Sequence, residues 1–141
     1  SMQTIGPDKI NQMRHALFLK DKNNTLAHMD KHAAIAKPKF DAVINILEKE
    51  LKDGGIAEWT NPEGGYFISV NVFPGTAKRV VALAKEAGVT FTPAGATYPY
   101  GVDPADTNIR VAPTRPPMEE LKTAAEILAN CIKIAAIEKL I

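Results

Sequence analysis

The stretch DTNIRVAPTRPP, residues 106–117, contains the side chain best suited to bind a ligand, Arg110. Side chains alternate between the two faces of a strand, so Ile109 and Val111 share one face and Arg110 points to the other. Asn108 shares the face of Arg110. A guanidinium is planar, always charged and able to hold a carboxylate through two parallel hydrogen bonds. The pattern alone leaves two interpretations open: an exposed strand arginine, or an arginine that holds an anion.

The segments on either side of this strand bear on that choice. TPAGATYPYGVDPAD, residues 92–106, is rich in proline, glycine and small residues and is predicted to be a loop. It carries Tyr98 and Tyr100, which could wall a pocket next to Arg110. Arg115, in the proline-rich turn after the strand, is predicted to be a surface charge.

Two histidines have the spacing of a metal-binding pair. His28 and His32 are four residues apart, which places both on one face of a helix, as in a zinc site. No glutamate adjoins the first histidine and no third ligand is evident, so two solvated histidines are predicted. The same holds for His15.

The remaining candidates for chemistry have simpler explanations. In FPGTAKRV, Gly75 precedes a helix start, but the second glycine and the Gly-Lys-Ser/Thr ending of a phosphate loop are missing. Cys131 falls on an apolar stripe and is predicted to lie in the core. No Ser-His-acid set, carboxylate pair or Cys-x-x-Cys motif is present, so the chain shows no catalytic machinery of its own.

Composition narrows the class of protein. The 141 residues suit one domain, and a net charge of +1 argues against nucleic-acid or membrane-surface binding. One cysteine excludes an internal disulfide and suits a reducing, cytoplasmic compartment. No apolar run approaches the roughly 20 residues of a membrane span, and no signal peptide is evident. Residues 1–2 resemble the remnant of a cleaved tag, and residues 3–141 are expected to be a piece of a longer chain.

The elements predicted around Arg110 begin with helices. The first helix is expected to start at Pro7, with Asp8 in its first turn, and a second runs from Thr25 as N-cap towards Asp53. Pro38 is expected to kink or restart that helix. Its core-facing stripe is Phe40, Val43, Ile44, Leu47 and Leu51.

The rest of the chain alternates strands and helices. Strands are predicted over 64–73, over 89–91 and around Arg110, with helices starting near 77 and after 117. The fold class is therefore α+β, a small antiparallel or mixed sheet of three to four strands packed against helices.

An ordered set of motifs resembles a known family. GGYFISVNVF, then a helix, AGVTFTPAGATYPYG, NIRVAPT and a long amphipathic helix resemble the small C-terminal domain of fold-type-I pyridoxal-phosphate aminotransferases. IGPDKINQMRH, HMDKHAAIAKPKFDAV and APTRPP look most similar to the aspartate-aminotransferase-like branch sometimes grouped with MocR-type proteins. The resemblance covers nearly all of residues 3–141. One departure is Pro93-Ala94-Gly95, where the family has Pro-Gly.

The resemblance implies roles for particular residues. Arg110 would grip the α-carboxylate of the substrate, and Tyr66 and Asn108 are further candidates for substrate binding. The Schiff-base lysine, its aspartate partner and the phosphate-binding residues would lie upstream in the large domain, so this piece would hold neither the pyridoxal 5'-phosphate site nor activity by itself. The parent would be a homodimer that moves an amino group between an amino acid, with aspartate favoured, and a 2-oxo acid.

A second function remains open. Related proteins join an aminotransferase-like domain to a DNA-binding head and act as transcription regulators. In that case the chain would be a small-ligand-binding regulatory module in which Arg110 senses an acidic metabolite. The DNA-binding head would lie outside this near-neutral chain.

Overall fold

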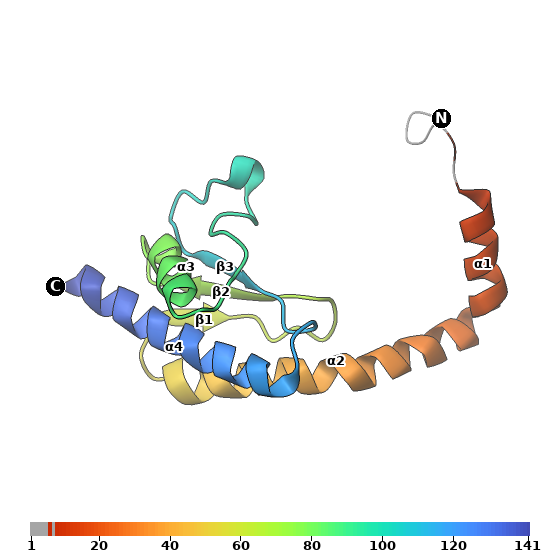
Figure 1. The fold of residues 1–141 in the computed structure, drawn as a ribbon, viewed down its shortest axis with the longest axis horizontal. Helices are drawn as coiled ribbons and strands as arrows, with labels where there is room; N and C mark the ends of the chain where they lie inside the picture. Colours follow the sequence, from red (N-terminus) through yellow and green to blue (C-terminus); the bar gives the residue numbers. More distant parts are fainter. Residues whose placement is uncertain (1–5, 7) are drawn as a thin grey trace. The chain divides into compact units, whose positions relative to one another are not determined.

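The computed structural model describes residue 6 and residues 8–141. They fall into two compact units, one ending at Lys37 and the other running from Pro38 to Ile141. Among the described residues no helix is both long and apolar enough to cross a membrane. Figure 1 shows the elements in chain order.

The first unit begins with helix α1, Lys9–Leu19. Asp8 is its N-cap rather than part of its first turn, and its carboxylate accepts a hydrogen bond from the backbone N–H of Asn11 at 2.9 Å. The expected start at Pro7 lies outside the described residues. None of the residues of α1 is buried.

Helix α2, Lys22–Leu51, begins earlier than the sequence indicated and is not interrupted. Asp21 caps it by accepting hydrogen bonds from the backbone and side-chain nitrogens of Asn24, so Thr25 is not the N-cap. The helix continues through Pro38, and the predicted restart there is wrong. A proline removes one backbone hydrogen bond, and the turns on either side keep theirs.

The second unit is built on a sheet whose strand order is β1-β2-β3, with both neighbouring pairs antiparallel. The strands are β1 (Ala57–Trp59), β2 (Ile68–Val72) and β3 (Asn108–Val111). The α+β prediction is therefore confirmed, with three strands. The short strand β1 was not predicted.

The predicted strand over 89–91 is wrong. The backbone N–H of Val89 donates to the carbonyl of Ala84, which closes the preceding helix instead of pairing with β3. Gly88 makes this turn with a φ of +87°, a conformation that glycine adopts without strain. The segment that follows therefore runs on as irregular backbone into the loop before β3.

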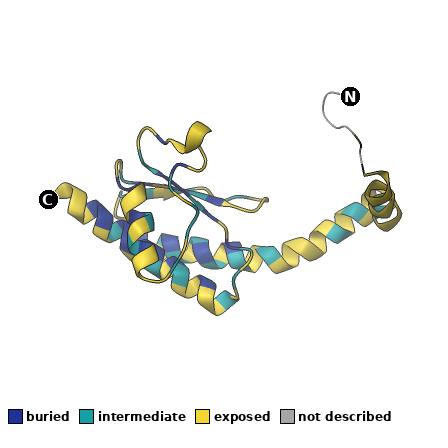
Figure 2. Cartoon of the chain, turned by 45° about the horizontal axis from the view of Figure 1, so that its top comes forward, coloured by how far each residue is buried: buried dark blue, intermediate teal, exposed yellow. Residues whose placement is uncertain are grey.

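One face of the sheet is apolar and packs on helices. Helices α3 (Ala77–Glu86) and α4 (Met118–Leu140) join the C-terminal part of α2 in this layer. Figure 2 shows the buried residues on the sides of these elements that face one another. The buried apolar residues of the strands and of α2 are Ile68, Val70, Val72, Ile109, Val111, Phe40, Val43, Leu47 and Leu51. The α2 stripe is thus confirmed, with Ile44 half-buried.

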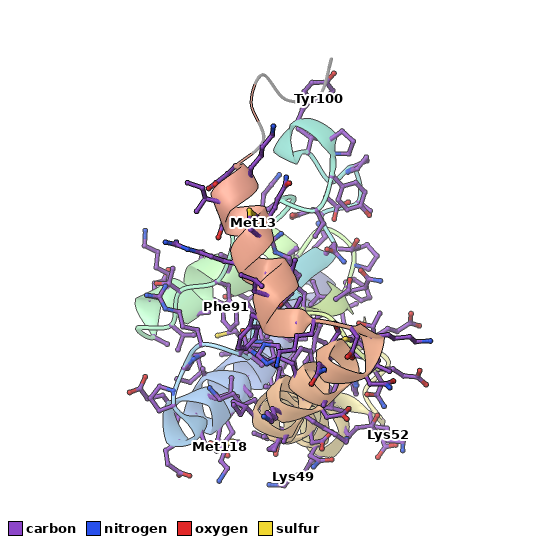
Figure 3. All side chains as sticks on the ribbon, turned by 90° about the vertical axis from the view of Figure 1, so that its right-hand side faces the viewer. Met13, Lys49, Lys52, Phe91, Tyr100 and Met118 are labelled. Atoms are coloured by element: carbon purple, nitrogen blue, oxygen red, sulfur yellow. The ribbon has the colours of Figure 1, made fainter. Side chains whose placement is uncertain are left out.

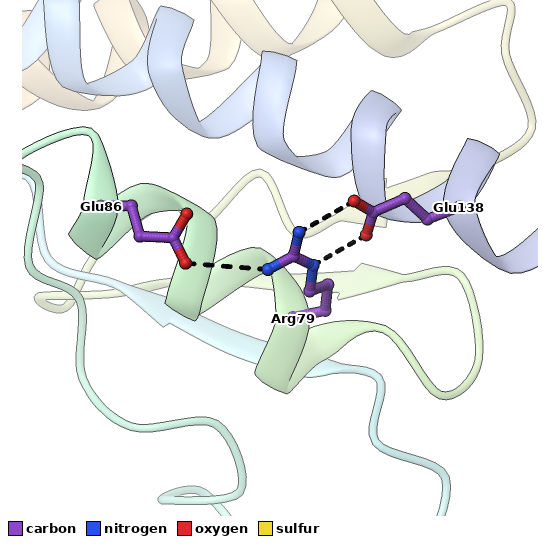
Figure 4. A network of polar contacts seen from close by, with 3 residues as sticks. All are labelled: Arg79, Glu86 and Glu138. Atoms are coloured by element: carbon purple, nitrogen blue, oxygen red, sulfur yellow. Dashed lines mark hydrogen bonds and ion pairs between the residues drawn. The ribbon is translucent and has the colours of Figure 1, made fainter.

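A surface ion pair links α3 to α4. Arg79 donates from Nε and Nη2 to the two carboxylate oxygens of Glu138, at 2.7 and 2.8 Å (Figure 4). Its Nη1 lies 3.8 Å from Glu86. The hydrogen bonds from Arg79 lower the pKa of the Glu138 carboxyl. This bidentate geometry holds the end of α4 against α3.

Candidate functional site

The second face of the sheet is polar, and Arg110 lies on it. Arg110 of β3 is opposite Ser69 of β2, and Asn108 is opposite Asn71. Ile109 lies on the apolar face and is 1% exposed, as the alternation of a strand requires. The face predicted for Arg110 is therefore confirmed.

The guanidinium of Arg110 has an aromatic neighbour. Its Cζ lies 4.5 Å from the ring centroid of Phe67, above the ring. Its Nε is buried and has no hydrogen-bond partner. Within the described part of the chain no carboxylate is paired with it. Nε is therefore a buried N–H donor for which the described residues supply no acceptor.

The oxygen and the nitrogen of the Asn108 side-chain amide are both hydrogen-bonded to protein side chains. Its amide nitrogen donates to Ser69 Oγ at 2.8 Å and to Asn71 Oδ1 at 2.7 Å. Its amide oxygen accepts a hydrogen bond from Thr97 Oγ1 at 2.7 Å. Asn108 thus connects β2, β3 and the loop before β3, two residues away from Arg110.

Asp103 closes that loop onto β3. Its carboxylate accepts hydrogen bonds from the backbone N–H groups of Ala105, Thr107 and Asn108, at 3.0, 2.8 and 2.8 Å. Burial alone would raise the pKa of the Asp103 carboxyl, but these backbone donors, with the Thr107 hydroxyl, hold its pKa below the ordinary value. Asp103 is therefore a charged group that fixes the start of β3.

The tyrosines are less closely involved. Tyr66 lies before β2 and is 71% exposed, and Tyr100 is fully exposed in the 3-10 turn η1, Pro99–Gly101. Figure 3 shows Tyr100 at the opposite end of this unit from Met118 and Lys49. Tyr98 is 39% exposed. Arg115 is exposed, as predicted.

A cavity of about 160 Å³ adjoins Arg110. It lies between β3, residues 89–92 and α4, and apolar side chains such as Phe91 and Leu121 dominate its lining.

The other candidate residues from the sequence are His28, His32, Gly75 and Cys131. His28 and His32 do meet, with their Nε2 atoms 3.1 Å apart, but residues 6 and 8–141 contain no group of three or more potential metal ligands. The helix start after Gly75 is occupied, because Asp106 accepts hydrogen bonds there from the backbone N–H groups of Thr76, Ala77 and Lys78. Cys131 is buried, as predicted, and burial raises the pKa of its thiol.

Five contributors to this site were not singled out in the sequence: Phe67, Ser69, Asn71, Thr97 and Asp103. Phe67 was detectable, because period-two alternation places it on the same face as Ser69 and hence on that of Arg110. Tyr66 has the opposite parity. Thr97 and Asp103 lie in a loop without periodicity, so their partners depend on how the loop folds.

Comparisons with known proteins agree on one family. The family model described as "Aspartate amino-transferase" matches residues 1–141. An aspartate aminotransferase of Corynebacterium glutamicum is 51% identical over 134 residues, which cover 95% of this chain and 31% of that protein. The chain spans about a third of the length of the curated relatives it matches.

Solved structures give the same result. The crystal structure of an aspartate transaminase from Corynebacterium glutamicum matches with a TM-score of 0.92 and 49% identity, covering 98% of this chain and 32% of that chain. The structure of Pyrococcus horikoshii kynurenine aminotransferase, in complex with PMP, matches with a TM-score of 0.66 and 28% identity, covering 77% of this chain and 26% of that chain.

Proposed function

The chain belongs to the aspartate aminotransferase family, and we propose that it is the part of such an enzyme that holds the substrate carboxylate through Arg110. The observation that carries this proposal is the position of the Arg110 guanidinium: it lies on the polar face of the sheet, over the Phe67 ring, and no carboxylate of the described residues is paired with it. Amino acids and 2-oxo acids both present a carboxylate next to the reacting carbon, so one arginine serves both halves of an amino transfer.

The chain's own residues do not fit a pyridoxal phosphate site. All described lysines are exposed except two. Of these, Lys39 donates to the backbone carbonyls of Thr114 and Pro116, and Lys133 donates to Glu50. The helix start of α3, which would suit a phosphate, is occupied by Asp106. We infer that the cofactor and the lysine that holds it belong to the rest of the enzyme.

The contribution of Arg110 to the reaction is binding and orientation. Two parallel N–H···O bonds fix the plane of a carboxylate as well as its position. The carbon next to that carboxylate is then held in one direction, and such orientation is a large part of what a protein adds to cofactor chemistry. Closure of this part over bound substrate would also exclude water.

The remaining partners follow from the family. The large cofactor-binding domain would lie in the same chain, outside residues 3–141, and a second copy would complete a homodimer. Aspartate is the favoured amino donor, in keeping with the name of the Corynebacterium glutamicum relative. Tyr66 stays a candidate at the edge of the cleft. Asn108 is better described as a support for β3, because its side chain is fully engaged with Ser69, Asn71 and Thr97.

The proposal is tested by removing the guanidinium in the full-length enzyme. Truncating a charged group that binds a buried carboxylate typically costs about 2–5 kcal/mol. Arg110→Ala should therefore raise the substrate KM at least tenfold and lower kcat/KM by more, while the absorbance of the bound cofactor stays unchanged. Arg110→Lys should recover only part, because an ammonium cannot form the two parallel bonds.

Arg115→Ala is the matched control, because Arg115 is an exposed arginine five residues away. Its kinetics should equal those of the unmodified enzyme. Unchanged KM and kcat in Arg110→Ala would refute the role of Arg110.

A further inference from the structure

Arg110 approaches its aromatic neighbour from the adjacent strand. Register pairs Ser69 with Arg110, so Phe67, two residues before Ser69, is the diagonal neighbour of Arg110 on the same face. Diagonal neighbours are within reach of long and aromatic side chains. The measured 4.5 Å from the guanidinium carbon to the ring centroid is well inside the roughly 6 Å limit of a cation–π contact.

For carboxylate binding, it matters that the group in contact with Arg110 is an aromatic ring and not a carboxylate. All five N–H donors of a guanidinium lie in its plane, and a carboxylate partner from the protein would occupy two of them. An aromatic ring attracts the charge through its π face and uses none of the donors. Phe67 therefore stabilises Arg110 without accepting a hydrogen bond from any of its N–H donors.

Phe67 also has little to do with the core. Phe67 is 45% exposed and precedes the first residue of β2. Ile68 and Val70 of β2 are fully buried, and their side chains lie on the opposite, apolar face of the sheet. A side chain this exposed contributes modestly to the packing of the unit. Its replacement by another apolar residue should leave the fold intact.

We propose that Phe67 is a positioning residue for substrate binding: its ring lies against one face of the Arg110 guanidinium, restricts that group to one plane and directs its free edge towards the carboxylate. This inference rests on the proposed role of Arg110. It goes beyond that role by assigning part of the carboxylate affinity to a residue that makes no hydrogen bond. A ring on one face also forces the carboxylate to approach in the guanidinium plane, which is the geometry of a bidentate pair.

The first test uses the 141-residue chain and needs no activity. Protons above an aromatic ring are shielded by its ring current, so the Nε–H proton of Arg110 should resonate upfield of those of the exposed Arg14 and Arg115. The shift should disappear in Phe67→Leu and persist in Phe67→Tyr, which keeps the ring. Phe18→Leu is the matched control, because Phe18 is an exposed phenylalanine of α1. An Arg110 signal that is the same in Phe67→Leu overturns the proposal.

The second test measures kinetics in the full-length enzyme. Phe67→Leu should raise the KM for the amino-acid substrate and the Ki of a simple dicarboxylate inhibitor by about 3- to 30-fold, the range of a cation–π contact. The change in kcat should be smaller, and Phe67→Tyr should restore KM to within about twofold. If Phe67 had only a structural role, Phe67→Leu would also lower the thermal unfolding temperature. We expect Phe67→Leu and Phe67→Tyr to unfold at the same temperature and to differ in KM.

The two proposals fail in different ways. If Arg110→Ala raises KM and Phe67→Leu does not, the role of Phe67 is wrong and that of Arg110 stands. If Arg110→Ala leaves KM unchanged, the role of Arg110 in substrate binding is wrong, and the role of Phe67 falls with it.

Discussion

A buried hydrogen-bond donor without an acceptor costs about 1–3 kcal/mol, and folded proteins contain few of them. Arg110 Nε is such a donor, and the guanidinium lies over the Phe67 ring with no carboxylate of the described residues paired with it. The kinetics of Arg110→Ala in the full-length enzyme decide between the two interpretations that the sequence left open.

Asp103 is the residue whose charge fixes the start of β3, and its role gives a prediction about pH. Its pKa is lower in the folded chain than in the unfolded chain. Its contribution to stability is therefore complete above the unfolded pKa and is lost as the pH falls through the folded pKa. Asp103→Asn should lower the unfolding temperature clearly at pH 7, since the new amide group faces backbone N–H donors. The difference from the unmodified chain should shrink below about pH 4, the ordinary range of an aspartate.

Thermal unfolding between pH 3 and 7 measures this difference. Asp53→Asn, a change of an exposed aspartate after α2, is the control. A loss of stability in Asp103→Asn that does not vary with pH would contradict the charged role of Asp103.

At the scale of elements, regular patterns were predictable and their ends were not. The α2 stripe and the alternation in β2 are spaced by helix and strand geometry, and both lie where that spacing indicated. The start of α2 depends on whether Asp21 or Thr25 caps it, and both residues are suitable by type. The segment 89–91 has strand-like residues, but its first N–H bonds back to Ala84, a contact that periodicity does not contain.

The loop before β3 depends on one close approach, and this predicts a large effect at Gly95. A Cβ added to Gly95 would strike the backbone carbonyl of Gly101, and Gly95 also has a φ of +86°. Gly88 has nearly the same φ, +87°, but a Cβ there would have no atom within 4 Å. Gly88→Ala should therefore cost about 1–2 kcal/mol, the strain of a left-handed residue. Gly95→Ala should cost more, because the loop must also move.

Urea unfolding of the two variants separates these contributions. The Nε–H signal of Arg110 should shift in Gly95→Ala, because this loop carries Thr97 and Asp103, and should stay in place in Gly88→Ala. Equal losses of stability in both variants would show that the contact between Gly95 and Gly101 has no energetic effect.

For the whole molecule, the central question is whether the chain contains a complete site. Arg110 supplies one charged partner for a carboxylate, and the described residues that line the adjoining cavity include no second cation. The chain also spans about a third of its curated relatives. Both observations fit a surface that forms one side of a cleft. A regulatory module that sensed an acidic metabolite would instead need a complete binding site within these residues.

Calorimetry of the 141-residue chain with a dicarboxylate decides between these two functions. A solvent-accessible ion pair contributes about 0–1 kcal/mol, whereas a dissociation constant of 1 mM requires about 4.1 kcal/mol. One side of a cleft should therefore bind a dicarboxylate more weakly than 1 mM, and Arg110→Ala should produce no measurable change in the heat. The full-length enzyme should bind the same compound at least tenfold more tightly, in a manner that depends on Arg110. Binding by the 141-residue chain in the micromolar range, abolished by Arg110→Ala, would instead favour the regulatory module, because it would show that these residues desolvate and surround the anion without further protein.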